Sequence, residues 1–345
     1  MEVVVTSALP SPDFWRGRRV FLTGHTGFKG GWMALWLHRL GAEVGGYSLA
    51  PSTTPSLFEA ARVAEACTDS VIGDIRDTAA LGRAFDAFRP DIVIHMAAQP
   101  LVRASYADPL DTYSTNVMGT ANLLEQVRTG SGVAATLIVT TDKCYENLEQ
   151  IWSYRETDRL GGRDPYSNSK ACAELVTQSY WWSFFSKQPG QALGSGRAGN
   201  VVGGGDWSQD LRRPEGVRPW QHVLEPVCGY LLAVERLVST PTETPPAWNF
   251  GPNPDGNISV GDVADMLIES WGGDARYEVR REANAVHEAT LLTLDHAKAR
   301  QELAWAPRWS PRTMLEMTAD WYRAFGAGDD MRAVSLRQLD TYIDA

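Results

Sequence analysis

The sequence predicts an α/β protein with a doubly wound parallel sheet and a smaller C-terminal lobe that binds the substrate. From Arg19 to about Thr141, short β-rich runs alternate with helical stretches, which is typical of βαβ units around a parallel sheet. A glycine-rich loop follows the first of these runs. After Ser183 the alternation ends, and loops rich in glycine and proline take over. The predicted sheet domain is therefore Rossmann-like.

Six predicted segments, four strands and two helices, make up this alternation. The short runs are rich in β-branched and aromatic residues and are predicted strands, whereas the longer stretches between them are predicted helices. The strands are expected at residues 20–22, 43–47, 92–94 and 136–139, and the helices at residues 32–40 and 119–127. We place the sheet domain at residues 14–186 and the smaller lobe at residues 187–345, and expect the two to interleave.

The bulk composition excludes several classes of protein. The chain has 345 residues, and its hydrophobic fraction of 43% is enough for a substantial core. Its net charge of -10, without runs of Lys or Arg, argues against a nucleic-acid surface. The four cysteines are scattered and form no C-x-x-C pair, so we expect reduced thiols and neither a zinc site nor a disulfide framework.

The N-terminus has no basic region followed by a long apolar core, and no apolar stretch approaches membrane-spanning length. Signal peptides and transmembrane helices need these features. We therefore expect a soluble cytoplasmic protein without a membrane partner.

A dinucleotide site is predicted at the glycine-rich loop. Glycines there allow a tight turn and let the backbone approach a pyrophosphate at the N-terminus of the following helix. The next strand ends in residues 46–50, which contain no acid for the ribose hydroxyls and no Arg cluster for a 2′-phosphate, so this rule leaves NAD and NADP undecided. The candidate loop residues are Gly24, Thr26, Gly27, Phe28, Lys29 and Gly30.

Two further segments follow apolar runs and are candidates for cofactor contact. Asp74 and Ile75 could meet the adenine, and Ala97, Ala98 and Gln99 could let the cofactor pass close to the backbone. The alternatives are a helix cap for Asp74 and close packing for the alanines. The local sequence favours neither interpretation.

The catalytic prediction depends on two motifs. Tyr166 and Lys170 are one helical turn apart, so both side chains leave the same face, as in the usual redox pair of a nicotinamide enzyme. Thr141, Asp142 and Lys143 stand at the end of an apolar run and add groups that alcohol oxidation alone does not require. Either motif alone could arise by chance, but both in this order after a glycine-rich loop indicate a catalytic site.

Together these residues resemble the extended short-chain dehydrogenase/reductase family, and within it the nucleotide-sugar 4,6-dehydratases. Thr-Asp followed by a third polar residue is the dehydration motif of that group. The third residue is usually Glu, and Lys143 is instead similar to the subgroup that acts on CDP-glucose. The resemblance covers nearly the whole chain and is carried by segments 24–29, 95–102, 113–120, 142–147, 197–207 and 218–223.

The resemblance implies a lyase that converts CDP-glucose to CDP-4-keto-6-deoxyglucose, with NAD reduced and reoxidised within one turnover. Tyr166 would take the proton of the sugar 4-hydroxyl, which requires roughly 4 kcal/mol of phenolate stabilisation at neutral pH. A Lys170 ammonium at about 4 Å, with an effective dielectric constant near 20, supplies roughly this amount. Thr141 would bind the 4-oxygen, and Asp142 would be the acid for the departing hydroxyl. Lys143 would either take the C5 proton or orient other groups.

For the substrate, the resemblance implies that Arg197 and Arg218 hold the diphosphate, with Asn200 and His222 as helpers. Arg103 is a weaker candidate for the same anion, and Asn116 completes the predicted substrate set. NAD would lie in residues 14–186 and the nucleotide sugar in residues 187–345, with no metal required. Relatives pair through helices, so we expect a homodimer or homotetramer that uses residues 106–127 or 169–185.

The chain departs from the family between Trp207 and Arg218, where only ten residues stand in place of a further helix and strand that cover the nucleotide. Two other functions stay open. A nucleotide-sugar 4-epimerase would share Tyr166 and Lys170 but needs no dehydration acid, so Asp142 argues against it. A dinucleotide-sensing or scaffold protein would keep the fold without turnover; the short segment favours it, and the intact Tyr166–Lys170 pair argues against it.

Overall fold

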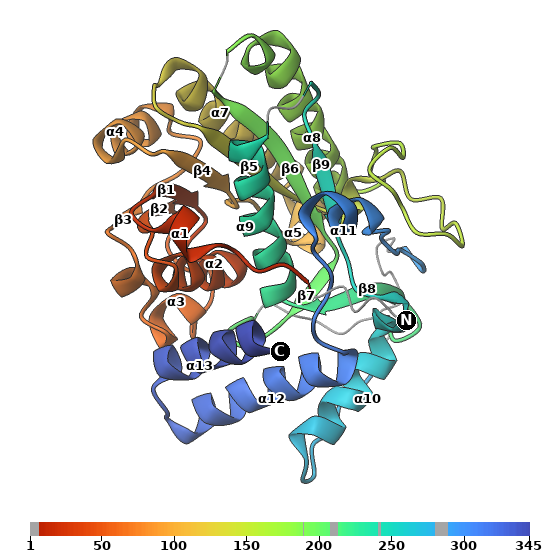
Figure 1. Ribbon diagram of the computed structural model, residues 1–345. Coiled ribbons are helices and arrows are strands. Elements are labelled where there is room, and N and C mark those ends of the chain that lie inside the picture. Colours follow the sequence, from red (N-terminus) through yellow and green to blue (C-terminus); the bar gives the residue numbers. More distant parts are fainter. Residues whose placement is uncertain (1–6, 189, 208–212, 241–242, 280–288) are drawn as a thin grey trace, which may run out of the picture.

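The computed structural model describes residues 7–188, 190–207, 213–240, 243–279 and 289–345. Seven parallel strands form the central sheet in the order β3-β2-β1-β4-β5-β6-β9 (Figure 1). The strand order reverses between β1 and β4, which makes their carboxyl ends the expected ligand site of such a sheet. The predicted fold class is confirmed. The strands are β1 (Arg19–Thr23), β2 (Glu43–Ser48), β3 (Asp69–Ile72), β4 (Ile92–His95), β5 (Ala135–Thr141), β6 (Ala192–Ala198) and β9 (Ala247–Phe250).

Helices cover both faces of the sheet. Along β1, Val20 and Leu22 join one buried cluster and Phe21 joins the other, as the two-residue period of a strand requires. On the first face lie α2 (Phe28–Arg39) and α9 (Leu224–Ser239), and on the second lie α4 (Thr78–Phe88), α7 (Gly119–Thr129) and α8 (Pro165–Ser183). Because both faces are buried, the strands are apolar along most of their length.

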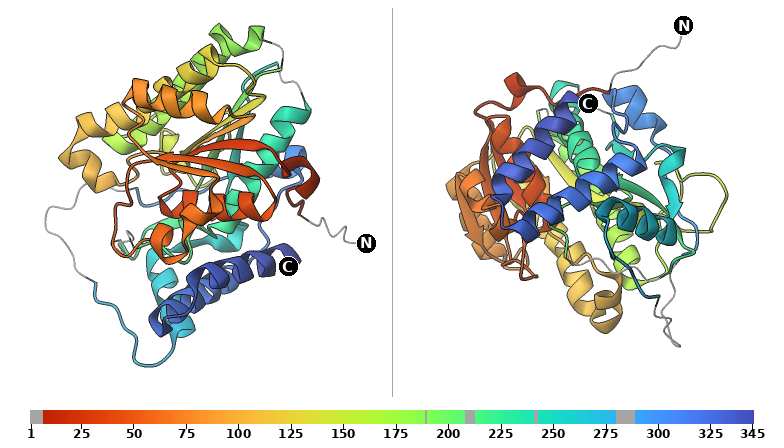
Figure 2. Two further views of the ribbon diagram at one scale, coloured as in Figure 1. Left: turned by 90° about the vertical axis from the view of Figure 1, so that its left-hand side faces the viewer. Right: turned by 90° about the horizontal axis from the view of Figure 1, so that it is seen from below.

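A smaller assembly closes one end of the sheet. Its three strands, β7 (Asn200–Val202), β8 (Val217–His222) and β10 (Asn257–Ser259), pair in the order β10-β8-β7. Three helices, α10 (Val260–Trp271), α12 (Pro311–Ala327) and α13 (Met331–Asp344), lie together beside it (Figures 1 and 2). The remaining short helices are α1 (Pro12–Trp15), α3 (Leu57–Ala60), α5 (Val102–Ala107), α6 (Pro109–Tyr113) and α11 (Ala297–Leu303).

A buried carboxylate attaches the C-terminal helices to the sheet domain. Glu225, in the first turn of α9, accepts hydrogen bonds from the Trp309 backbone N–H at 2.8 Å and from the Tyr342 hydroxyl at 2.6 Å. Burial raises the pKa of Glu225 to about 7, and these donors oppose that rise. Because the donors come from α13 and from the loop before α12, these two C-terminal helices are bound to the sheet domain.

The observed elements extend the predicted ones. The first predicted helix begins at Phe28 rather than at residue 32, because the end of the glycine loop forms the first helical turn. Strands β6 and β9 follow residue 186 in sequence and still lie in the large sheet. The two predicted segments therefore share one sheet, and the division of cofactor and substrate binding between residues 14–186 and 187–345 stays a prediction.

All four cysteine thiols are unpaired. Within the described residues, no helix has both the length and the apolarity that a bilayer crossing requires. The same part of the chain contains no cluster of His, Cys, Asp or Glu side chains that could hold a metal ion.

Candidate active site

A cavity of about 790 Å³ opens at the carboxyl ends of the parallel strands. It extends from the glycine loop before α2, past the ends of β2, β4 and β5, to the small sheet at β8. This is the position in which doubly wound sheets bind their ligands. All the predicted catalytic side chains except that of Asp142 line it, namely Thr141, Lys143, Tyr166 and Lys170.

The glycine loop is packed too closely for larger residues. Gly24 has a φ of +83°, and a Cβ there would lie 2.7 Å from the backbone nitrogen of Ala97. A Cβ on Gly30 would lie 2.0 Å from the carbonyl oxygen of Gly24. Gly27 caps the N-terminus of α2 and, with Gly24 and Gly30, lines the cavity. The unpaired N–H groups of the first helical turn are therefore positioned to bind a pyrophosphate.

We expect Gly30→Ala to disrupt this loop. The added methyl group would overpack a backbone contact, which costs about 1–3 kcal/mol, and would displace the turn that binds a dinucleotide. Thermal unfolding and dinucleotide titration would measure the two effects. Gly326→Ala, in α12 with no atom within 4 Å of the added Cβ, is the matched control and should leave dinucleotide affinity unchanged. Wild-type affinity in Gly30→Ala would contradict the role of this close contact.

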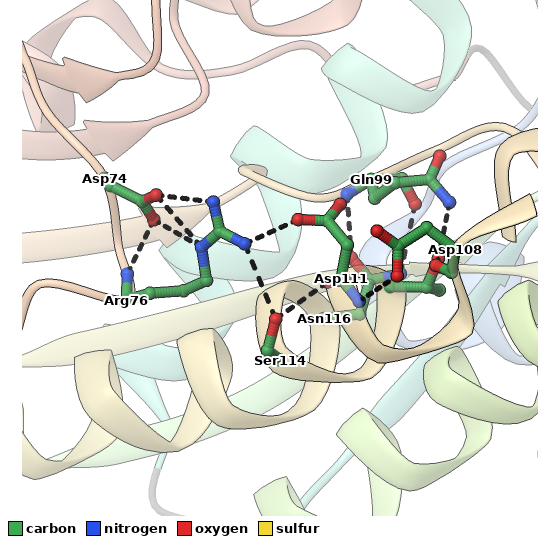
Figure 3. Close-up of polar contacts among 8 residues, drawn as sticks. Asp74, Arg76, Gln99, Asp108, Asp111, Ser114 and Asn116 are labelled. Carbon is green, nitrogen blue, oxygen red and sulfur yellow. Dashed lines mark hydrogen bonds and ion pairs between the residues drawn. The ribbon is translucent and has the colours of Figure 1, made fainter.

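An ion-pair cluster after β3 borders the cavity. Arg76 donates to both oxygens of Asp74, at 2.6–3.0 Å, and its other nitrogen donates to Asp111 at 2.5 Å. Figure 3 shows the guanidinium between the two carboxylates. The hydrogen bonds from Arg76 lower the pKa of Asp74. Asp74 and Ile75 both line the cavity, and the cap of α4 is Asp77, not Asp74.

Asn116 organises the loop after β4 instead of lining the cavity. Its side chain accepts from the Gln99 backbone N–H at 2.8 Å and donates to the Gln99 carbonyl at 3.0 Å (Figure 3). It also donates to the Ser169 hydroxyl of α8 at 2.8 Å. Asn116 lies in the π-helical turn Ser114–Met118 and is buried. It thereby holds Ala97, Ala98 and Gln99 along the cavity wall.

The dehydration motif follows β5 directly. The Thr141 hydroxyl donates to Asp142 Oδ1 at 2.8 Å, and Asp142 is fully buried in the 3-10 turn Asp142–Cys144. The second oxygen of Asp142 is buried and has no hydrogen-bond partner among the described residues. The Lys143 ammonium donates to Asn200 Oδ1 at 3.2 Å and lies 3.8 Å from Asp142 Oδ1. One carboxylate oxygen of Asp142 is therefore available for a further hydrogen bond.

The redox pair lies on α8. Asp164 caps this helix by accepting from the Ser167 N–H, and Pro165 occupies its first turn. Burial raises the pKa of Tyr166, whereas a hydrogen bond with Thr141 lowers it. Burial, reinforced by the charge of Lys29, lowers the pKa of Lys170 to about 8. Tyr166, Thr141 and Asp142 thus form one chain of hydrogen bonds.

The predicted substrate residues divide into two groups. Asn200 and Arg218 line the cavity, together with Arg213, which sequence reasoning missed. The Arg218 guanidinium is oriented by the carbonyls of Val217, Thr290 and Ala289. Arg103, Arg197 and His222 are not among the lining residues.

The buried positions of Arg197 and His222 indicate structural roles. His222 packs edge-on against Trp32 and Trp309, and burial lowers its pKa to about 3. Arg197 is 1% exposed and pairs with Glu174 at 2.8 Å. Neither side chain can contact a diphosphate in the cavity from these positions. Arg103 is exposed on α5 and does not line the cavity, although its neighbours Val102 and Ala104 do.

Glu174 is a functional neighbour that sequence reasoning missed. It lies one turn after Lys170 on α8 and accepts from Thr140, from Ser195 at 2.8 Å and from Arg197. Arg197 in turn donates to the Tyr145 hydroxyl at 2.9 Å. The turn that carries Thr141 and Asp142 is therefore held from both sides. The spacing Tyr166, Lys170, Glu174 was the signal that could have revealed it.

Comparison with known proteins identifies the family of this chain. The model of the family described as GDP-mannose 4,6 dehydratase matches residues 21–186. The CDP-glucose 4,6-dehydratase of Salmonella typhimurium is 46% identical over 354 residues, which cover 96% of this chain and 98% of that protein. The chain belongs to the CDP-glucose 4,6-dehydratase family.

Other members of the wider group are more distant. The UDP-glucose 4-epimerase of Erwinia amylovora is 25% identical, covering 90% of this dehydratase-family chain and 99% of the epimerase. A dTDP-glucose 4,6-dehydratase of Streptomyces venezuelae, solved with NAD bound, superimposes with a TM-score of 0.75 at 23% identity, covering 91% of this chain and 99% of that one. At 23% identity, the similarity to this structure supports a shared fold. Residues 208–212, in the segment that is shorter than the family pattern, lie outside the described residues.

Proposed function

We propose that the protein converts CDP-glucose to CDP-4-keto-6-deoxyglucose and water, using bound NAD. One observation carries the proposal: the dehydration motif Thr141–Lys143 and the redox pair Tyr166 and Lys170 meet at one cavity. An epimerase needs only the second of these. The identity to the Salmonella enzyme supports CDP-glucose as the substrate.

The cavity fits NAD at its glycine-rich end. The cradle at Gly24 and Gly30 would close if either carried a Cβ, so the backbone can approach a pyrophosphate there. When bound, NAD would take a hydride from C4 of the sugar and return it to C6. Arg76, which follows β3, forms ion pairs with both Asp74 and Asp111. This pairing favours NAD over NADP, because a 2′-phosphate would meet two carboxylates.

We assign acid and base roles along the hydrogen-bond chain. Tyr166 would take the proton of the 4-hydroxyl, with the Lys170 ammonium stabilising the phenolate. Thr141 would pass this proton from Tyr166 to Asp142, because its hydroxyl contacts both. Asp142, which does not itself line the cavity, would then give it to the departing C6 hydroxyl through Thr141, whose hydroxyl contacts Asp142 and which lines the cavity. The proton removed in the first step thus leaves in the water, and the residues are reset.

Arg218, Arg213 and Asn200 are our candidates for the diphosphate and sugar, because they line the far end of the cavity. Two arginines at the wall suit a diphosphate, which guanidinium groups bind in a bidentate manner. Substrate binding in this scheme needs no metal.

The test is to incubate the protein with CDP-, dTDP-, UDP- and GDP-glucose, with and without added NAD, and to follow C4 and C6 of the sugar by NMR. A 4-ketone and a new 6-methyl signal from CDP-glucose are expected. Inversion at C4 with C6 unchanged would instead establish a 4-epimerase. NAD binding without reaction of any sugar would identify a sensing or scaffold protein.

We also propose that the protein forms a homodimer through α8. Leu175 and Trp182 are two turns apart on this helix and are each 54% exposed, and Met118 beside α7 is 55% exposed. Apolar side chains of this size on neighbouring helices are typical of subunit contacts. Trp182→Glu is expected to yield monomers in light scattering. Trp271→Glu, which changes an exposed tryptophan of α10, should leave the dimer intact, and a wild-type monomer would refute the proposal.

A further inference from the structure

The cavity holds a third lysine beside the two predicted catalytic ones. Lys29 is the second residue of α2 and lines the same cavity as Lys143 and Lys170. Its ammonium lies 5.9 Å from the ring centre of Tyr230. Among the described residues, no hydrogen bond or ion pair is formed by this ammonium. A partly buried amine without an acceptor has little to retain its proton.

Burial, rather than the surrounding charges, favours the neutral form of Lys29. Burial lowers the pKa of Lys29 to about 8; Lys143 adds to this effect, and Asp142 and Asp206 oppose it. Lys170 also has a pKa lowered to about 8, by burial and then by the charge of Lys29. Loss of the Lys29 proton removes this charge, so Lys170 holds its own proton more tightly, and the phenolate of Tyr166 needs that positive charge.

Lys143 stands in a different environment. Its ammonium donates to Asn200 Oδ1 at 3.2 Å and is 3.8 Å from Asp142 Oδ1. Both oxygens stabilise the charged form of an amine. A general base must be neutral before it accepts a proton. Lys143 is therefore suited to a charged, orienting role, whereas Lys29 is suited to that of a base.

We infer that Lys29 is the base that removes the C5 proton of the sugar during water loss, an inference that rests on the proposed dehydratase function. The neutral amine takes the proton from C5, and the electron pair of the C5–H bond forms the C5–C6 double bond as the C6–O bond breaks. The leaving hydroxyl takes the proton of Asp142 and departs as water. After C6 has received the hydride, the Lys29 ammonium returns a proton to C5. No co-reactant other than NAD is needed.

The experiment compares Lys29→Met and Lys29→Arg with the matched variant Lys143→Met. Each is checked by thermal unfolding and NAD titration, then assayed for C4 oxidation in a single turnover and for deuterium exchange at C5 in D₂O. Of the two Lys29 variants, the uncharged Lys29→Met should bind NAD and oxidise C4 normally, because neither step uses an amine at position 29. In both variants, C5 exchange and 6-methyl formation should fall about 10²–10⁴-fold, the usual contribution of a general base. Lys143→Met, which removes an orienting ammonium and not the base, should lower C5 exchange much less than the Lys29 variants do.

Added primary amines provide a readout that a structural role would not affect. In Lys29→Ala, methylamine should restore C5 exchange in proportion to its neutral fraction. Loss of C5 exchange in Lys143→Met, with retention in Lys29→Met, would overturn the inference in favour of Lys143. Loss of NAD affinity in Lys29→Met would make Lys29 a cofactor ligand instead.

If the proposed function is wrong, a different result is expected: the wild-type protein would convert none of the nucleotide sugars. The ligand-free protein still tests Lys29 in that case. Mass spectrometry after brief amine acylation at several pH values measures the neutral fraction of Lys29. A titration near pH 8 is expected, and a value near that of free lysine, about 10.4, would overturn the inference.

Discussion

Tyr166→Phe is expected to lower kcat by about 10²–10⁴-fold, the usual contribution of a general acid–base group, while NAD affinity stays at the wild-type value. The Tyr166 hydroxyl contacts Thr141, and Tyr166 lies one turn before Lys170 on the same face of α8. Removing this hydroxyl therefore prevents the first proton transfer but leaves the glycine loop able to bind NAD. Stopped-flow measurement of C4 oxidation and equilibrium titration of NAD would separate the two effects. Tyr180→Phe, on the same helix and away from the cavity, is the matched control.

The pH dependence of C4 oxidation in a single turnover, a step that does not use the Lys29 amine, gives the same prediction a second test. Burial raises the pKa of Tyr166 in the ligand-free protein, so the phenolate depends on the positive charge of Lys170. That lysine, with its pKa lowered to about 8, loses its charge as the pH rises through this value, and the rate of C4 oxidation should fall there. Tyr166 ionisation gives the opposite, acid-side limb. Tyr166→Phe should remove the acid limb, and an unchanged profile would contradict the role of Tyr166 as the base.

Arg197→Met is expected to destabilise the fold by about 3–5 kcal/mol, the usual result of removing one partner of a buried ion pair. Glu174 and Arg197 are 1–2% exposed and 2.8 Å apart, so the variant leaves Glu174 charged and unpaired in the interior. Urea denaturation would measure the loss. Arg16→Met, which removes an exposed pair with Asp13 at 3.6 Å, should cost less than about 1 kcal/mol.

A second substitution and measurements at several pH values distinguish the loss of this ion pair from a loss of side-chain packing. Burial raises the pKa of Glu174, but Arg197 and the hydroxyl donors outweigh it and lower the pKa overall. The wild-type pair therefore contributes stability above the ordinary carboxyl pKa and loses it as the pH falls. Arg197→Met should be least harmful at acid pH, and adding Glu174→Gln should recover part of the stability at pH 7. A deficit that is independent of pH and unchanged in the double variant would assign the effect to packing.

The cofactor half of the site could be predicted from sequence because its determinants are local. Gly24 and Gly30 act through backbone contacts within one turn, and Tyr166 and Lys170 depend only on the helical period. The alternation of strands and helices likewise predicts a parallel sheet whose ligand site lies at the carboxyl edge.

The substrate-binding residues could not be predicted reliably from sequence. Their roles depend on whether each polar side chain is buried, and a single sequence does not reveal this. Arg197 and Arg218 both stand in short strands near glycine-rich loops, yet one pairs with Glu174 in the interior and the other lines the cavity. Asn116 was predicted as a substrate residue, but its amide holds the loop at Gln99. The role of each of these side chains was determined by the hydrogen-bond or ion-pair partner that the neighbouring helices and strands placed beside it.

The sequence by itself determined the sheet, the glycine loop and the presence of two proton-transfer motifs, because each depends on spacing along a few residues. Only the tertiary structure decided that Lys29, Lys143 and Lys170 share one cavity. They come from α2, the turn after β5, and α8, which are far apart in the chain. Parallel strands end at the same edge of the sheet, so these amines meet there, and burial and mutual repulsion lower the pKa values of Lys29 and Lys170.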